Sequence, residues 1–384
     1  MIEILEPYNG ENFIRYPVII NEKKHIFEIK YNTEILNNDI DGIVAMLAPI
    51  AICNRWRITS KLPIDKLLYD NLLNIPFVYR KFYNQNANQL GNLQKERISL
   101  KLDLPKIVRD SSYRKNITPI SLGVDSMHTI DVNKKDLTHL IYINHFDTST
   151  NIKIFPQLVE LIALKYKKEL IIAESNFLSV LNSLKLPGTN FHIFLSDAIL
   201  FASCYPLGIK NLYFSGFGGD IPCLISQNSE VTQFFNSNVT KIVQNQTLRI
   251  KKLKYLAENT LAMTTLRVCN EDYISKNKGI LNCSKCKKCS RTLVYLYMLG
   301  RINDATTFEK VDDNYLEYYL ENHFQSKEYP RTVASTYYDK IFLNILKLYK
   351  ENGNLNDLDN YDFIFIGEEN VIFNRKVSHR NALA

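Results

Sequence analysis

The stretch Ser121–Ser126, Ser-Leu-Gly-Val-Asp-Ser, has the residue types of an anion-binding turn. It follows an apolar run and precedes a helical pattern, so N–H groups at the helix N-terminus would point toward a bound anion. Gly123 lets a ligand approach the backbone closely, and Ser121 and Ser126 can donate hydroxyl hydrogen bonds. Asp125 would repel a bare phosphate, which predicts a cation such as Mg²⁺ between them. The alternative is an ordinary strand–turn–helix with capping side chains.

Four cysteines form a second group of residues that could do chemistry. Cys283, Cys286 and Cys289 are each separated by two residues, and Cys269 lies upstream. Four thiolates at such spacings fit a tetrahedral zinc site without an open position, which predicts a structural role. An iron–sulfur cluster uses the same spacing, but the Cys-Pro that usually follows is absent, which favours zinc. Four basic side chains of the same segment would offset the thiolate charge: Lys285, Lys287, Lys288 and Arg291.

Composition sets the limits for the rest of the chain. With 46% hydrophobic residues, it can bury a core and is not globally disordered. The net charge of +7 is compatible with nucleotide binding, but no long Lys/Arg run indicates nucleic acid specifically. The sequence begins without a basic secretory n-region, and its longest uncharged apolar run, residues 42 to 53, is too short to span a bilayer. These features and the metal-type cysteines predict a cytoplasmic protein without membrane contact.

From about residue 115 the pattern alternates between strands and helices, which is typical of a doubly wound parallel sheet. The strands predicted after the first loop are 140–145, 170–174 and 211–216, and the helices between them are 156–168 and 192–205. Because ligands bind at the carboxyl ends of parallel strands, the polar residues there predict one nucleotide crevice. The residues predicted to line it are Ser121, Leu122, Gly123, Val124, Asp125, Ser126, Asn144, His145, Gly216, Gly218, Gly219 and Asp220.

Three basic residues before a later helix, Arg249, Lys251 and Lys252, are predicted to reach the triphosphate, and Arg249 and Lys252 are taken as nucleotide-binding residues. Solvated surface charges are the alternative interpretation of all three.

Residues 1–110 read as an α+β appendage without a chemical motif. A hairpin is predicted over 13–20 and 25–30, and then a helix over 39–53 capped by Asn38 or Asp39. Another helical pattern, 64–83, must break near Pro76. The appendage would bind a macromolecular acceptor, or it would serve packing or homodimer formation. Residues 301–384 read as a mostly helical extension.

The loop resembles the Ser-Gly-Gly-x-Asp-Ser loop of the N-type ATP pyrophosphatases, or PP-loop enzymes, which cleave ATP between the α and β phosphates. Leu122 stands where that loop has glycine. With Cys269 and the later Asn-Cys-x-x-Cys-x-x-Cys-x-Arg, residues 115 to 300 resemble the 7-cyano-7-deazaguanine synthases. The flanking Leu-Arg-Val-Cys and Cys-Ser-Arg-Thr-Leu are closer to larger synthase-like PP-loop proteins, including those of antiphage gene clusters.

This resemblance implies an adenine nucleotide alpha-hydrolase-like domain over residues 111–300, with ATP, Mg²⁺ and Zn²⁺ as cofactors. Ser121, Asp125 and Ser126 would be catalytic, and the four cysteines would bind zinc within 269–292. The implied reaction is the adenylation of a carboxylate, such as a 7-deazaguanine-type acid. The activated acid would then form an amide with ammonia or with the amine of a protein or peptide, in a carbon–nitrogen ligase of antiphage defence.

Two other functions remain open at this stage. Some PP-loop enzymes thiolate tRNA, and Cys204 and Cys223 would supply sulfur-transfer thiols. A non-catalytic nucleotide- and zinc-binding module is the third interpretation, with Leu122 as a sign of a decayed loop.

Overall fold

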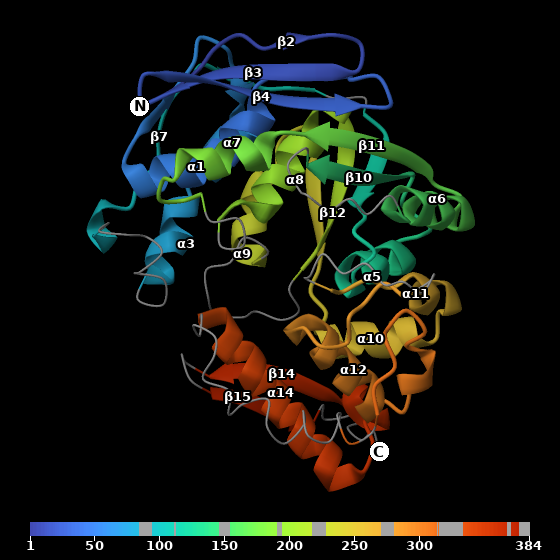
Figure 1. Cartoon of the computed structure of the whole chain (residues 1–384). Coiled ribbons are helices and arrows are strands. Elements are labelled where there is room, and N and C mark those ends of the chain that lie inside the picture. The colour runs from blue at the N-terminus through green and yellow to red at the C-terminus, as the bar shows by residue number, and fades with distance from the viewer. Residues whose placement is uncertain are drawn as a thin grey trace, which may run out of the picture. The chain divides into compact units, whose positions relative to one another are not determined.

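The computed structural model is shown in Figure 1. The residues that it describes are 1–83, 94–110, 113–145, 154–189, 194–216, 228–269, 280–312, 314, 333–366 and 370–375. Contacts divide the chain into two compact units, which are described separately. The sheet unit comprises Met1–Ser121, Thr129–Gly216 and Cys223–Asn245, and the cysteine unit comprises Leu122–His128, Phe217–Pro222 and Gln246–Ala384.

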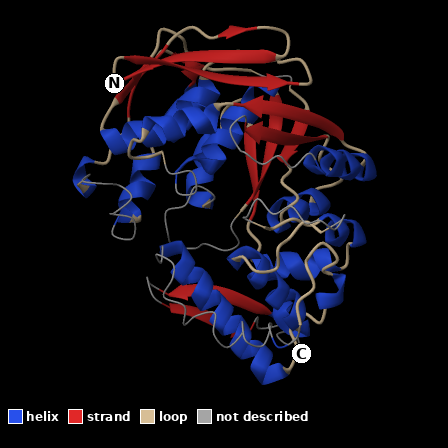
Figure 2. Cartoon of the chain, viewed as in Figure 1, coloured by secondary structure: helices blue, strands red, loops and turns tan. Residues whose placement is uncertain are grey.

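One continuous sheet forms the core of the sheet unit (Figure 2). Its strands, in spatial order, are β13 (Lys241–Asn245), β12 (Ile209–Ser215), β9 (Lys115–Pro119), β10 (His139–His145), β11 (Glu169–Ser175), β4 (Lys23–Tyr31), β3 (Phe13–Ile20), β1 (Ile2–Ile4), β5 (Arg57–Thr59) and β7 (Lys101–Asp103). A short strand, β2 (Tyr8–Asn9), pairs with β3.

The five strands from β9 to β13 pair in parallel. In chain order their spatial arrangement is 3-2-1-4-5, the order of a doubly wound sheet, and it reverses direction between β9 and β12. The chain leaves β9 directly before the Ser121–Ser126 loop, and helix α5 (Val124–Val132) follows. The predicted α/β class with a mostly parallel central sheet is therefore confirmed.

Residues 1–110 extend the same sheet, since β4 pairs antiparallel with β11. The predicted hairpin is confirmed as β3 and β4. Its two-residue turn places Asn21 and Glu22 at φ of 49° and 69°, the left-handed values that suit the twist of a tight hairpin. The proposed division at residues 110 and 300 stays a prediction about domains.

Helix α1 (Asp41–Asn54) is buried along nearly its whole length because it is apolar on every side. A Cβ on Gly42 would lie 3.1 Å from the Cα of Ala202 in α8 (Ser196–Cys204), so glycine permits this close helix packing. The N-cap position falls at Ile40 and not at Asn38 or Asp39 as predicted, but the Asp39 Oδ1 still accepts the N–H of Asp41, the first residue of the helix, at 3.2 Å. Asp39 is also part of a buried ion-pair network.

The pattern over 64–83 breaks as predicted into α2 (Lys66–Leu72) and α3 (Ile75–Lys81), with Pro76 in the first turn of α3. A two-stranded sheet, β6 (Ile64–Asp65) with β8 (Lys106–Ile107), lies beside α2.

The cysteine unit is mainly helical. Its helices and strands are α10 (Arg249–Ala257), α11 (Thr260–Thr265), α12 (Lys287–Met298), α14 (Val333–Asn352), β14 (Tyr361–Ile366) and β15 (Asn370–Arg375). Part of the mostly helical extension predicted over 301–384 lies outside the described residues, including 315–332. Helix α10 contacts both α11 and α12, and Tyr295 of α12 packs on Phe342 of α14 with ring centroids 5.5 Å apart. Within the described residues, no helix combines the length and apolar character needed to cross a membrane.

Candidate functional site

The loop before α5 has an unusual backbone at Leu122. Its φ of 59° lies in the left-handed region, which costs an L-residue of this size about 1–3 kcal/mol. Its side chain is fully buried, and that burial contributes about 1.5–3 kcal/mol. The Arg267 N–H also donates to the Leu122 carbonyl oxygen at 2.9 Å. The loop therefore adopts its glycine-type conformation without glycine, because packing offsets the strain.

Asp125 lies in the first turn of α5 and pairs with two cations of α10. Lys252 Nζ donates to its Oδ1 at 2.7 Å, and Arg249 Nη1 donates to its Oδ2 at 2.9 Å. The Asp125 side chain is 40% exposed, whereas that of Lys252 is 1% exposed. Burial raises the pKa of Asp125, but the charges of Lys252 and Arg249 outweigh it and hold the pKa at about 2. The carboxylate is ionised, and it faces solvent on one side.

Helix α12 adds two more basic residues to this site. The charge of Arg291 also lowers the pKa of Asp125. The pKa of Lys288 is lowered by burial and by Arg249 and Arg291, while Asp125 and Cys286 act in the opposite direction. We call Arg249, Lys252, Lys288 and Arg291 the basic cluster. Asp125 and these four basic groups thus interact within the cysteine unit, and a group of cations of this kind suits an anion.

Sequence reasoning identified only half of this basic cluster. Arg249 and Lys252 were predicted to contact phosphates, whereas Lys288 and Arg291 were expected only to offset thiolate charge. Their spacing of three residues was the available signal, since residues at i and i+3 share one side of a helix.

The four cysteines converge, as their spacing predicted. Their Sγ atoms all lie within 4.8 Å of one another. The distances from Cys269 to Cys283 and to Cys286 are 3.4 and 3.8 Å, and that from Cys283 to Cys289 is 3.9 Å. A tetrahedral ion with metal–sulfur bonds of about 2.3 Å would separate its sulfurs by about 3.8 Å. The Cys286 N–H also donates to Cys283 Sγ at 3.3 Å. The cluster could therefore hold a metal such as zinc.

Asn282 fixes the two chain segments that carry these cysteines. Its buried Oδ1 accepts from the N–H groups of Val268 and Cys269 at 2.7 and 3.1 Å. Its Nδ2 donates to the carbonyl oxygens of Leu266 and Thr307 at 2.9 and 3.3 Å. One amide side chain thus sets the register between Cys269 and the later cysteines, a role that the cysteine spacing alone did not reveal.

Four other predicted site residues follow or end parallel strands of the sheet unit, at their carboxyl ends: Ser121, Asn144, His145 and Gly216. Ser121 follows β9 and is exposed, and Asn144 and His145 end β10, with Asn144 exposed. Gly216 follows β12, and its N–H donates to the Asn245 carbonyl oxygen at 3.0 Å. The other members of the predicted glycine segment lie outside the described residues: Gly218, Gly219 and Asp220.

Ser126 lies in the cysteine unit with the rest of the loop. Its Oγ donates to the Gly123 carbonyl oxygen at 3.2 Å, within its own turn. A role for this hydroxyl toward phosphate stays a prediction.

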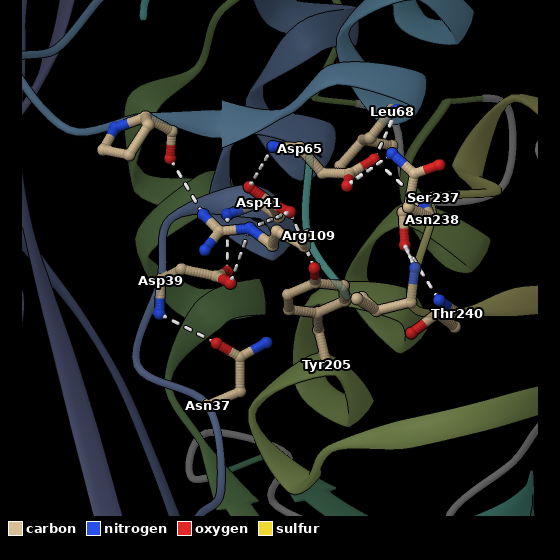
Figure 3. A network of polar contacts seen from close by, with 12 residues as sticks. Asn37, Asp39, Asp41, Asp65, Leu68, Arg109, Tyr205, Ser237, Asn238 and Thr240 are labelled. Carbon is tan, nitrogen blue, oxygen red and sulfur yellow. Dashed lines mark hydrogen bonds and ion pairs between the residues drawn. The ribbon is translucent and has the colours of Figure 1, made fainter. Parts of the chain in front are cut away.

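The sheet unit contains a second ion-pair network, which we call the Asp39–Asp41–Arg109 network (Figure 3). Arg109 Nε lies 3.2 Å from Asp39 Oδ2 and 3.4 Å from Asp41 Oδ2. Tyr205 donates its hydroxyl to Asp41 Oδ2 at 2.6 Å, and the Asp65 N–H donates to Asp41 Oδ1 at 3.1 Å. Burial and the adjacent Asp41 raise the pKa of Asp39 to about 8, although Arg109 opposes the rise. This network joins the starts of α1 and α2 to Tyr205, directly after α8.

In comparisons with known proteins, no protein-family model matches this sequence, and no curated protein matches it either.

Proposed function

We propose that this chain is an ATP-dependent adenylating enzyme that releases AMP and pyrophosphate while activating a carboxylate. The observation that carries the proposal is the basic cluster around Asp125, at the first turn of α5. Four basic groups and a helix N-terminus attract a polyanion. Asp125 offsets part of this positive charge until an anionic ligand replaces it as the partner of Arg249 and Lys252. A triphosphate or pyrophosphate has the charge and reach to contact several of these groups at once.

The sheet topology supports a nucleotide ligand. In open α/β sheets, ligands bind outside the carboxyl ends of the strands where the strand order reverses. That reversal falls between β9 and β12 here, and the strand β9 leads directly into the loop. A P-loop of the Walker A type is not the basis of the proposal, because no Gly-Lys-Ser/Thr follows the turn.

In the proposed reaction, a carboxylate oxygen of the substrate attacks the α-phosphorus of ATP. The bond from that phosphorus to the bridging oxygen breaks, and pyrophosphate leaves with the electron pair. Arg249, Lys252 and the loop N–H groups stabilise the charge that develops on the leaving pyrophosphate. A nitrogen nucleophile then attacks the acyl carbon of the adenylate, AMP departs, the nitrogen loses a proton, and an amide results.

Asp125 is not a ready Mg²⁺ site by itself, since each carboxylate oxygen already accepts from a cation. Mg²⁺ is usually bound by one or two carboxylates together with substrate phosphates. We therefore propose that Asp125 would help to hold Mg²⁺ only in the presence of ATP, once the phosphates had replaced it as the partner of Arg249 and Lys252.

For the cysteine cluster we propose zinc in a closed, structural site formed by Cys269, Cys283, Cys286 and Cys289. When bound, zinc would crosslink two distant chain segments, and four protein ligands leave no position for catalysis.

The substrate class is proposed from the resemblance to deazaguanine synthases: a 7-deazaguanine-type acid, with ammonia or a protein amine as acceptor, in antiphage defence. Thiolation of tRNA is less well supported. Cys204 is fully buried, and burial raises the pKa of its thiol, which disfavours the thiolate that sulfur transfer needs. Cys223 lies outside the described residues.

The test is to incubate the metal-loaded protein with ATP labelled at the α and γ positions, 7-carboxy-7-deazaguanine and ammonia. Formation of AMP and pyrophosphate that depends on the acid supports the proposal. Lys252→Met should abolish product formation while the protein stays folded, because a neutral side chain of similar length replaces the ammonium. Release of ADP and phosphate, or AMP formation undiminished by Lys252→Met, would reject this assignment.

A further inference from the structure

Helix α12 belongs to both the cysteine cluster and the basic cluster. Cys286 occupies its N-cap position, and Cys289 lies in its first turn. Lys288 and Arg291 alternate with these cysteines along the same first two turns, and α12 packs against α10, which carries Arg249 and Lys252. Because a helix fixes the relative directions of residues on successive turns, the cysteines and the two cations cannot be positioned independently.

A second connection runs through Arg267, two residues before Cys269. Its N–H donates to the Leu122 carbonyl oxygen at 2.9 Å, and its Nη1 donates to the Cys269 carbonyl oxygen at 3.1 Å. The strained residue of the loop is thus hydrogen-bonded to the segment that supplies the first cysteine. Both the loop and two of the four cations depend on the geometry of the cysteine segments.

We propose that occupancy of the four-cysteine centre sets the anion affinity of the basic cluster, because the centre positions Lys288, Arg291 and the Leu122 loop. The inference rests on the anion site of the proposed function, and it adds metal-dependent control of that site. Loss of the metal, by chelation or by oxidation of the thiolates, would release the start of α12 and weaken polyanion binding without any change in the basic residues.

The metal centre can affect anion binding in two ways, through the position of α12 and through its own charge, and the two effects have opposite signs. Four thiolates around a divalent ion carry two excess negative charges, which by Coulomb's law alone would weaken the attraction of an anion to Lys288. The metal strengthens anion binding only if the placement of α12 outweighs that repulsion. Coupling between two sites is reciprocal, so pyrophosphate must then tighten metal binding by the same factor.

The experiment uses the full chain in its metal-loaded form with inorganic pyrophosphate as the probe. Zinc release to a chromophoric chelator is timed with and without saturating pyrophosphate, and cobalt-substituted protein is followed by its visible absorption bands. We expect pyrophosphate to slow zinc release about tenfold and to shift the cobalt bands. Both readouts start from folded, loaded protein, so they do not require the metal-free chain to remain folded.

Two variants distinguish an effect on the coupling between metal and anion from an effect on pyrophosphate affinity alone. Arg249→Gln lies on α10, so at saturating pyrophosphate it should keep the slower release and the cobalt shift. Lys288→Gln combined with Arg291→Gln removes the cations of α12 and should lose both effects at saturation. Calorimetric titration confirms saturation in each case.

Three outcomes overturn the proposal. Pyrophosphate that binds without altering zinc release or the cobalt spectrum rejects the coupling and leaves the anion site intact. Equal slowing in the wild type and in the double variant would show a general stabilisation of the fold instead. Failure of the loaded wild type to bind pyrophosphate would reject both the anion site and the inference.

Discussion

Two ion-pair networks in the described part of the chain differ in how many carboxylates and cations they bring together. In the Asp39–Asp41–Arg109 network, two buried carboxylates share one guanidinium, and the pKa of Asp39 rises to about 8. At Asp125, one half-exposed carboxylate meets an excess of cations, and its pKa falls to about 2. In the structural network, buried charge is limited because Asp39 can take up a proton. The Asp125 carboxylate instead stays ionised and reaches solvent, so an anionic ligand can replace it as the partner of Arg249 and Lys252.

The largest effect is expected from Arg109→Met in the structural network. The substitution leaves two buried carboxyl groups without their cation, and any charge that they do not remove by taking up protons stays uncompensated. The free energy of unfolding should fall by up to about 3–5 kcal/mol. Urea denaturation at pH 7 measures the change. The matched variant, Lys252→Met in the basic cluster, should cost clearly less, because Arg249 still pairs with Asp125 and an apolar side chain suits the buried position of Lys252. Equal losses in the two variants would remove the distinction between the clusters.

The pH dependence of stability should have opposite signs at the two clusters. An aspartate with its pKa raised to about 8 takes up a proton on folding. Its contribution to stability is therefore fully present below about pH 4 and is lost as the pH rises through 8. The low pKa of Asp125 gives a contribution that is present above about pH 4 and is lost as the pH falls toward 2.

Asp39→Asn isolates the first of these contributions. Between pH 6 and 8, the wild type should lose stability relative to this variant by at most about 1.4 kcal/mol per pH unit. Urea denaturation across that range provides the measurement. Parallel stability curves for the two proteins would show that Asp39 is ionised throughout.

Leu122→Gly tests whether packing of the Leu122 side chain stabilises the loop beside Asp125, whereas ion pairs stabilise the network of the sheet unit. Glycine relieves backbone strain of about 1–3 kcal/mol but removes side-chain burial of about 1.5–3 kcal/mol. We expect a net loss near 1 kcal/mol in thermal denaturation, with pyrophosphate affinity kept within about twofold. A stabilised variant with much tighter pyrophosphate binding would identify Leu122 as a defect of the loop.

The smallest effect expected is a change of a few-fold in affinity for Asp125→Asn, with a sign that depends on magnesium. Without Mg²⁺, pyrophosphate should bind more tightly, because a repelling charge is gone. With Mg²⁺, ATP should bind more weakly, because the proposed ligand of the ion is lost. Calorimetric titrations of the wild type and the variant, with pyrophosphate alone and with ATP and Mg²⁺, measure both changes in affinity. A gain under both conditions would show that Asp125 does not serve the ion.

The sequence predicted what local patterns control. The alternation of strands and helices predicted the parallel sheet, and the strand patterns on either side of Asn21 and Glu22 predicted the hairpin. The spacing of the cysteines predicted their cluster. These features depend on periodicity and short spacings, which are readable from neighbouring residues.

Features that depend on contacts between distant segments were missed. Asp39 looked like a cap by its position before α1, but Arg109 pairs with it from a distant segment of the chain. Lys288 and Arg291 read as neighbours of cysteines, since nothing local reveals that α12 lies against α10. The positive φ of Leu122 was likewise hidden, because a left-handed leucine is intrinsically unfavourable and only packing permits it.

Nucleotide binding by the basic cluster is tested by calorimetric titration of ATP into the metal-loaded protein and its Lys252→Met and Arg109→Met variants. We predict that the wild type binds one ATP, with an affinity that falls steeply with added salt. Lys252→Met should bind at least about tenfold more weakly, and the folded fraction of Arg109→Met should bind like the wild type. Absence of ATP binding, or equal affinities for wild type and Lys252→Met, would contradict the claim that the basic cluster is a nucleotide site.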